Sequence, residues 1–254
     1  MRWFSPSAFR VWQRNRDVFL KLWRSEIPGF LAEPILIILA MGIGLGAYVG
    51  MVDGQRYVEF IAPGIVAGYA MFSASFECTY GSFIRMEYQK TYDAIIATPL
   101  SIEDVVAGEI FWGATRAMIT TTAVLTIATL FGLIHTPWAI LVLPLGMLSG
   151  LMFASIAFSF TSLAPSIGSF NYFFTLIITP MFYFSGIFFP LDSFPTIVQR
   201  LSWVAPLTPV ANITRSLVQG EFGYSMIWQL LVIVCIATIF FCLSLVLMRR
   251  RLLK

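Results

Sequence analysis

The stretch FFTLIITPMFYFSGIFFPLDSFP, residues 173–195, is apolar enough to lie in a membrane, yet it contains four residues that interrupt helices. These are Pro180, Gly186, Pro190 and Pro195. Proline removes a backbone donor and clashes with the preceding turn, and glycine has a low helix propensity. We therefore expect a membrane helix that kinks at Pro180 and ends between Gly186 and Pro190.

The composition around this stretch is that of an integral membrane protein. Hydrophobic residues make up 58% of the 254 residues and charged residues only 11%, whereas soluble domains are about one-quarter charged. The first 30 residues carry several Lys and Arg and no cleavable apolar core, so we expect no signal peptide. The three cysteines lie in apolar runs without zinc or disulfide spacing, which indicates packed thiols.

Apolar windows of about 20 residues, the length that crosses the hydrocarbon core, predict six spans. The run from Ala117 to Leu191 contains no Asp, Glu, Lys or Arg, and turn-like gaps at 132–138 and 162–169 divide it into helices. We expect an all-α polytopic fold in a single domain over residues 1–254. Its spans should lie near 30–52, 58–82, 105–133, 138–162, 169–189 and 225–248.

The positions of Lys and Arg predict the orientation of these spans. If the N-terminus is cytoplasmic, twelve Lys and Arg residues lie on the cytoplasmic side and only Arg56, Arg200 and Arg215 lie outside. Because cytoplasmic loops carry the excess of positive charge, we expect both termini to be cytoplasmic. A seventh span within 196–220 is the alternative, and it would place the basic C-terminus outside.

Residues 1–28 predict an amphipathic helix that lies in the membrane interface as an elbow before the first span. Cations such as Arg10, Arg14 and Lys21 share the polar side, and Arg16 intrudes on the apolar side, where its side chain must snorkel or find a partner. The apolar side should carry Phe9, Trp12, Phe19, Leu20, Trp23 and Ile27.

Motifs for nucleotide hydrolysis and for hydrolytic catalysis do not occur in the sequence. It has no Gly-Lys dipeptide, hence no phosphate-binding Walker loop, and its single histidine is His135. We therefore expect no catalytic residue and no metal site, and the net charge of +3 is too small to indicate a nucleic-acid partner. A membrane-embedded lipid-modifying enzyme and a secondary transporter remain alternatives to a transport subunit.

Arg116 is the one basic residue that falls inside a predicted span, seven residues after Glu109. A charge at membrane depth costs about 2.5–3.5 kcal/mol, so it needs a partner or a water path. One interpretation is a structural pair with Glu77 or with a neighbouring helix. The other is a direct contact with an anionic substrate headgroup.

The polar segment between the second and third spans predicts a short amphipathic helix. Tyr88, Tyr92, Ile95 and Ile96 recur at helical spacing, and Thr98 precedes a proline that ends the helix. The next helix should start at Ser101, because Asp104 completes a capping box. This short helix is either a plain surface helix or a docking site for a cytoplasmic partner.

Two motifs resemble those of the ABC-2 type exporter permeases. The first is the T-P-L-S turn after the polar amphipathic helix, at residues 98–101. The second is a helix that runs through T-P into aromatics and then S-G and F-P, at Thr179, Pro180, Ser185, Gly186, Phe189 and Pro190. Residues 203–209 and 215–220 fit the same pattern, and within the family the chain is most similar to the nodulation-factor exporter permeases, which transport lipo-chitooligosaccharides.

This resemblance implies a homodimer of the chain with two copies of a cytoplasmic ABC ATPase in the bacterial inner membrane. ATP and Mg²⁺ would bind to the partner, and this chain would hold no cofactor. The substrate would be amphipathic, a glycolipid, lipo-oligosaccharide, polysaccharide or hydrophobic drug, and it would move outward. Residues 87–98 would form the coupling helix that contacts the ATPase, with Glu87, Tyr88, Gln89, Tyr92, Ile95, Ile96, Thr98 and Pro99 as candidate contacts.

In this topology the interrupted span becomes an outer gate. The residues that follow it are too polar to cross and too apolar for a free loop, so we expect two short external helices near 193–204 and 207–219 that re-enter the outer leaflet. Irregular backbone at membrane depth is tolerated only where protein or a water-filled cavity covers it. Candidate path or gate residues are Arg116, Pro180, Phe182, Tyr183, Phe184, Gly186, Phe189 and Pro190; lipid-facing packing is the alternative for the aromatic ones.

Overall fold

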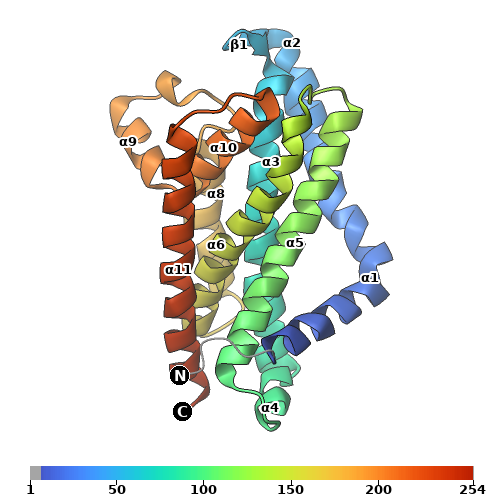
Figure 1. Ribbon diagram of the computed structural model, residues 1–254, viewed down its shortest axis with the longest axis vertical. Helices are drawn as coiled ribbons and strands as arrows, with labels where there is room; N and C mark the ends of the chain where they lie inside the picture. Colours follow the sequence, from blue (N-terminus) through green and yellow to red (C-terminus); the bar gives the residue numbers. More distant parts are fainter. Residues whose placement is uncertain (1–6, 254) are drawn as a thin grey trace.

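The computed structural model describes residues 7–253, which form long helices packed side by side (Figure 1). Five helices are long and apolar enough to cross a membrane: Leu31–Val49, Tyr57–Tyr88, Ile102–Leu130, Pro137–Leu163 and Ser225–Leu252. The all-α polytopic fold is confirmed. The fifth expected span, near 169–189, is helical only over residues 169–184, which is shorter than the ~20 residues that cross a bilayer.

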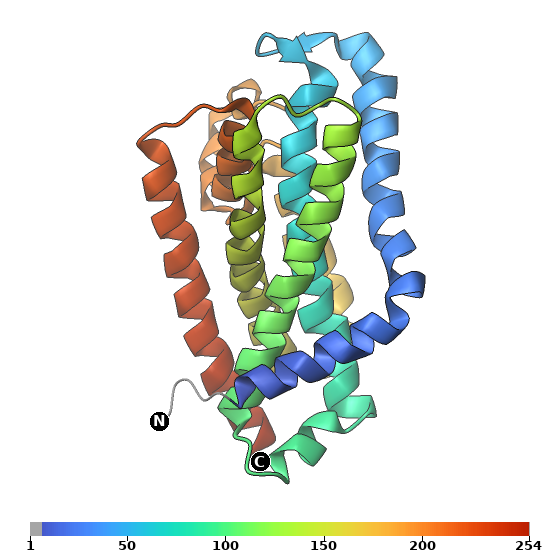
Figure 2. The same cartoon turned by 45° about the vertical axis from the view of Figure 1, so that its right-hand side comes forward.

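The expected elbow and the first span form one bent helix instead of two separate ones. α1 (Ala8–Ile37) continues through η1 (Ile38–Leu45) into α2 (Gly46–Val49), and it changes direction in its middle (Figure 2). Pro28 lies inside α1 and has no N–H to donate to the preceding turn, which weakens the helix there. The first six residues of the expected elbow lie outside the described part of the chain.

The first part of α1 has two apolar sides, and the sequence pattern identified only one. Ala8, Val11 and Phe19 are buried against the bundle, whereas Phe9 and Leu20 are more than half exposed. The side chain of Ile27 is outside the described residues. We infer that the second apolar side faces lipid, because a helix that lies in the membrane interface beside a bundle contacts the bundle on one side and lipid on another.

A small β-hairpin follows the first span, and the sequence analysis did not predict it. β1 (Met51–Val52) pairs antiparallel with β2 (Gln55–Arg56). Asp53 and Gly54 at the turn both have positive φ, 49° and 76°, as two-residue hairpin turns require.

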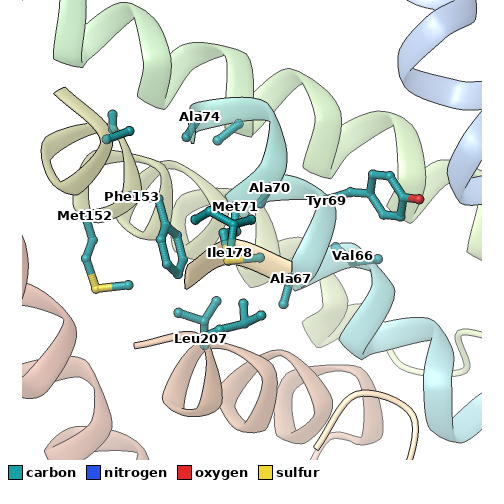
Figure 3. Close-up of a cluster of buried hydrophobic side chains, with 14 of the residues drawn as sticks. Val66, Ala67, Tyr69, Ala70, Met71, Ala74, Met152, Phe153, Ile178 and Leu207 are labelled. Atoms are coloured by element: carbon teal, nitrogen blue, oxygen red, sulfur yellow. The ribbon is translucent and has the colours of Figure 1, made fainter. Parts of the chain in front are cut away.

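The helix after the hairpin is the core of the bundle. It comprises α3 (Tyr57–Phe76), η2 (Glu77–Gly81), residues 82–83 and η3 (Ile84–Tyr88), and 83% of its most apolar window is buried. α5 (Ile102–Leu130), α6 (Val142–Leu163, after η4, Pro137–Leu141) and α10 (Leu207–Gln219) pack around it. Figure 3 shows its centre, where side chains of α3 meet Met152 and Phe153 of α6, Ile178 and Leu207.

The last helix, α11 (Ser225–Leu252), lies at the side of the bundle, and only 11% of its most apolar window is buried. It contacts α6 through polar groups, because Ser159 Oγ and Ser244 Oγ lie 2.9 Å apart. Near its end, Arg251 Nη1 donates to the carbonyls of Thr161 and Ala164 at 2.7 and 2.8 Å. α11 is therefore the helix with the most surface left for lipid or for another chain.

The bundle has two distinct ends (Figure 1). The terminal end carries the start of α1, the end of α11 and α4 (Thr91–Ile96). The hairpin end carries β1 and β2. From the terminal end towards the hairpin end run α7 (Ser169–Phe173), η5 (Phe174–Ile178) and α8 (Thr179–Phe184) in succession. They are followed by η6 (Leu191–Ser193), α9 (Thr196–Val204) and α10. Two short helices thus occupy the region after the interrupted span.

Candidate functional site

The short helix at the terminal end begins later than expected. The long core helix continues to Tyr88, Lys90 adopts a left-handed φ of 51°, and α4 starts only at Thr91. The expected single helix over 87–98 is therefore wrong, because Glu87 and Tyr88 belong to the preceding helix and Gln89 lies at the break. Helical spacing across residues 88–96 cannot reveal a left-handed residue between them.

The residues expected to contact an ATPase consequently divide into two groups. Tyr92 is fully buried, and Ile95 and Ile96 are half-buried against the bundle. Tyr88 is 66% exposed. The exposed surface of the loop therefore consists of Tyr88, Gln89, Lys90, Asp93, Ala94, Ala97, Thr98 and Pro99.

Several polar contacts attach α4 and its flanks to the bundle. Glu87 pairs with Arg251 of α11 at 2.9 Å and with Lys90 at 3.6 Å. Ser101 Oγ accepts the backbone N–H of Asp104 at 3.2 Å, and the Asp104 carboxylate accepts the N–H of Ser101 at 3.0 Å, so the expected capping box is confirmed. Burial raises the pKa of the Tyr92 hydroxyl. α4 is thus a short helix with an exposed outer side, and the residues before and after it are attached to the bundle.

A cluster of charged residues lies inside the terminal end, and we call Glu26, Glu77, Arg85, Glu109 and Arg116 the charge cluster. Arg85 Nη2 lies 2.6 Å from Glu109 Oε2 and 2.8 Å from Glu77 Oε1. Arg116 Nη1 lies 2.6 Å from Glu26 Oε2, and its Nε lies 3.4 Å from Glu77 Oε2. These five residues come from α1, the core helix and α5, so the cluster joins three helices.

Hydrogen bonds complete the surroundings of the most buried acid. Glu109 is fully buried and accepts from Asn15 Nδ2 and from Ser82 Oγ, each at 3.0 Å. A buried charge is tolerated when opposite charges and donors surround it. The charge cluster therefore fastens the first part of α1 to the bundle.

The structure favours the structural interpretation of Arg116. Its side chain is 8% exposed, is paired with two acids, and stacks over the Phe19 ring at 4.7 Å. Sequence reasoning missed Arg85, which it assigned to a solvated loop. The signal available was its spacing from Glu77, eight residues or about two turns along one helix.

At the other end, the helix of residues 169–184 stops at Phe184, and Gly186 takes a left-handed φ of 75°. Arg215 Nη2 of α10 donates to the Gly186 carbonyl at 2.8 Å, and its guanidinium lies 4.3 Å from the centre of the Phe60 ring. Pro180 stands directly after a turn of π-helix, η5, and such a turn accommodates a missing backbone hydrogen bond. We call residues 185–190 the break segment.

The break segment packs on the core helix where that helix has glycines. Ile187 is fully buried, and a Cβ placed on Gly64 would lie 2.9 Å from its Cγ2. A Cβ on Gly68 would overlap the ring of Phe182, which is 4% exposed. Only glycine at these two positions allows this close approach.

The expected path or gate residues therefore have different surroundings. Phe182 lies in the core, and Arg116 lies in the charge cluster at the opposite end. Tyr183, Phe184 and Phe189 are each about half exposed, and Pro190 is half-buried before η6. Pro180 and Phe184 line an apolar groove of about 540 Å³ between α8 and α9.

Comparison with known proteins agrees with this architecture. The family model described as "ABC-2 type transporter" matches residues 11–219. Nodulation protein J of Sinorhizobium fredii is 38% identical over 244 residues, which cover 96% of this chain and 93% of that protein. Nodulation protein J of Rhizobium meliloti is 38% identical over 244 residues, 95% of this chain and 92% of that protein.

A more distant relative extends the similarity beyond these proteins. The inner membrane transport permease YadH of Escherichia coli is 23% identical over 209 residues, 78% of this chain and 77% of that protein. The family match covers well over half of the chain, including α1, the charge cluster, α4 and the break segment. The chain belongs to the ABC-2 type transporter family, as the transmembrane permease subunit of an ABC exporter.

Proposed function

We propose that this chain moves an amphipathic glycolipid or lipo-oligosaccharide outward across the bacterial inner membrane, as a homodimer with two ABC ATPase subunits. The substrate class is the one that the resemblance to the nodulation-factor exporter permeases implies, and two relatives named nodulation protein J are 38% identical to this chain. ATP and Mg²⁺ bind to the partner. The terminal end then faces the cytoplasm, which agrees with the basic residues Arg249, Arg250 and Arg251 at the end of α11.

The observation that carries the proposal is the construction of α4. Its outer surface offers small and polar side chains, Asp93, Ala94 and Ala97, to a partner. Its inner side is fixed by Tyr92 and by the capping box that begins α5. A push on α4 therefore reaches α5, a continuous helix of 29 residues, and through Glu109 it reaches the charge cluster.

The break segment is the corresponding moving part at the outer face. It has no regular helix of its own, and Arg215 and apolar contacts hold it on α3. ATP-driven closure of the ATPases changes the relative stability of the inward and outward states of the two permeases. Separation of the break segment from α3 opens the exit.

Large charged side chains on the outer surface of α4 test the docking assignment. We expect Ala94→Arg and Ala97→Arg to abolish co-purification of the ABC ATPase and its ATP turnover in reconstituted vesicles, while the permease still purifies as a folded protein. The matched control is Ser166→Arg, at an exposed position in the loop between α6 and α7 at the terminal end. Normal ATPase association in both α4 variants, or equal loss in the control, would contradict the assignment.

A further inference from the structure

A second cavity lies at membrane depth in the wall of the bundle, about one helical turn from the charge cluster, since Thr120 follows Arg116 on α5. It has a volume of about 380 Å³ and opens between α1, α3, α5 and η5. Its lining residues are Gly29, Glu33, Tyr69, Phe72, Ser73, Phe76, Thr120 and Phe174. The volume falls within the range of about 300–1,000 Å³ that is typical of ligand sites.

One part of this cavity is polar, although the surrounding helices are apolar. Thr120 Oγ1 donates to Ser73 Oγ at 2.9 Å, and both side chains are more than 90% buried. Glu33 of α1 and Tyr69 of α3 also line the cavity. Figure 3 shows Tyr69 directed away from the core cluster, with its hydroxyl oxygen outermost.

Glu33 is exposed on α1 and differs from the other glutamates described in the membrane-spanning helices. Glu77 and Glu109 pair with arginines, and Glu59 pairs with Arg56. No ion pair joins Glu33 to another residue in the described part of the chain, although it lies within an apolar span. Ionisable residues in such positions are costly and mark functional sites.

Another part of the cavity lining is aromatic. The rings of Phe72 and Phe174 lie nearly parallel with centroids 6.4 Å apart, and Phe76 lies 5.5 Å from Phe174. Aromatic faces pack against the C–H groups of a sugar ring, while a carboxylate accepts its hydroxyl protons and Tyr, Ser and Thr hydroxyls both donate and accept. An unpaired carboxylate also disfavours an anionic ligand.

We propose that this cavity binds a neutral, hydroxyl-rich sugar ring of the transported molecule, with Glu33 and Tyr69 as the residues that determine specificity. The inference rests on the proposed export of a glycolipid or lipo-oligosaccharide. Each copy of the permease would thus bind the sugar in its own cavity, between α1 and α3. The acyl part of the molecule stays in the lipid that the open side of the cavity faces.

Binding of chitotetraose to the full chain in lipid nanodiscs, measured by calorimetry, tests the site without the ATPase. We expect Tyr69→Phe and Glu33→Gln each to weaken binding about tenfold or more, as the loss of a hydrogen bond that involves a charged group predicts. Tyr172→Phe is the matched control, because Tyr172 is 70% exposed on α7 outside the cavity, and its affinity should stay within about twofold of wild type.

Two results would overturn the sugar site: no saturable chitotetraose binding by the wild type, or wild-type affinity in both cavity variants. ATP-driven transport of a fluorescent lipo-chitooligosaccharide by the wild-type complex tests the proposed function separately. If the wild-type complex transports but the variants bind chitotetraose with unchanged affinity, the sugar site is contradicted and the proposed function is supported. If the variants bind chitotetraose more weakly but the wild-type complex does not transport, the sugar site is supported and the proposed function is contradicted.

Discussion

The terminal end and the hairpin end of the bundle solve similar structural problems in opposite ways. At the terminal end, three acids and two arginines from three helices pair with one another in the charge cluster. At the hairpin end, an interrupted helix is held by one arginine–carbonyl hydrogen bond and by packing against two glycines. The first arrangement uses paired charges, and the second uses one polar contact with apolar surface.

This difference indicates which end can change shape. Separating a buried ion pair leaves uncompensated charges and costs about 3–5 kcal/mol. Releasing a neutral carbonyl from an arginine costs about 1.5–3 kcal/mol. The terminal end is therefore suited to transmit motion as a unit, and the hairpin end is suited to open.

Removal of Arg85 should give the largest effect on the terminal end. Arg85→Leu removes the arginine that pairs with the buried Glu109 and should lower the free energy of unfolding by about 3–5 kcal/mol. Thermal unfolding of the purified protein in detergent measures this loss.

The matched control for Arg85→Leu is Arg56→Leu, because the side chain of Arg56 is 63% exposed beside Glu59. An exposed pair of this kind contributes only about 0–1 kcal/mol. Adding Glu109→Leu to Arg85→Leu should recover part of the lost stability, because the orphaned carboxylate is then absent. Equal unfolding temperatures for Arg85→Leu and Arg56→Leu would show that the charge cluster does not hold the helices together.

Arg215→Met should have the next largest effect, and it should be local. It removes the donor to the Gly186 carbonyl and should weaken the attachment of residues 185–190 by about 1.5–3 kcal/mol. Hydrogen exchange of the break segment should therefore become faster while exchange in α5 stays unchanged. The control is Arg200→Met on α9, where the side chain is exposed. Equal hydrogen exchange of the break segment in the two variants would show that Arg215 does not hold this segment.

Gly68→Ala should have a smaller effect on the same end. The added methyl group overlaps the Phe182 ring, which Phe72 and Phe188 confine with centroids 5.1 and 5.2 Å away. Overpacking of this kind costs about 1–3 kcal/mol. Gly44→Ala is the control, because the nearest heavy atom to its added Cβ would be 3.8 Å away. Thermal unfolding measures both variants. Equal unfolding temperatures for Gly68→Ala and Gly44→Ala would contradict the close approach at Gly68.

The features that the sequence predicted well were those encoded by neighbouring residues. Ser101 and Asp104 are three residues apart, and their capping box could be identified directly. The glycine at 186 and the prolines on both sides indicated where the helix of residues 169–184 ends. In each case the physical cause lies within one or two helical turns.

The features that the sequence did not predict depend on contacts between distant segments. Arg85 belongs to a charge cluster only because α1 and α5 bring Glu26 and Glu109 beside the core helix. The left-handed Lys90 ends one helix and begins another within an apparently uniform amphipathic pattern. Phe182 is buried whereas the next residue, Tyr183, is exposed, because Gly68 of α3 lies opposite Phe182 and leaves room for its ring.

A reversible lock on the break segment tests the central claim that this segment opens during transport. Ile187→Cys and Gly64→Cys would place two Cβ atoms about 3.1 Å apart, slightly closer than the ~3.8 Å that is usual for a disulfide. The exposed and half-buried cysteines, Cys235 and Cys242, are first replaced by serine. We expect the oxidised protein to assemble with its ATPase but not to transport lipo-chitooligosaccharide, and reductant to restore transport; transport at the wild-type rate with the disulfide formed would contradict the account.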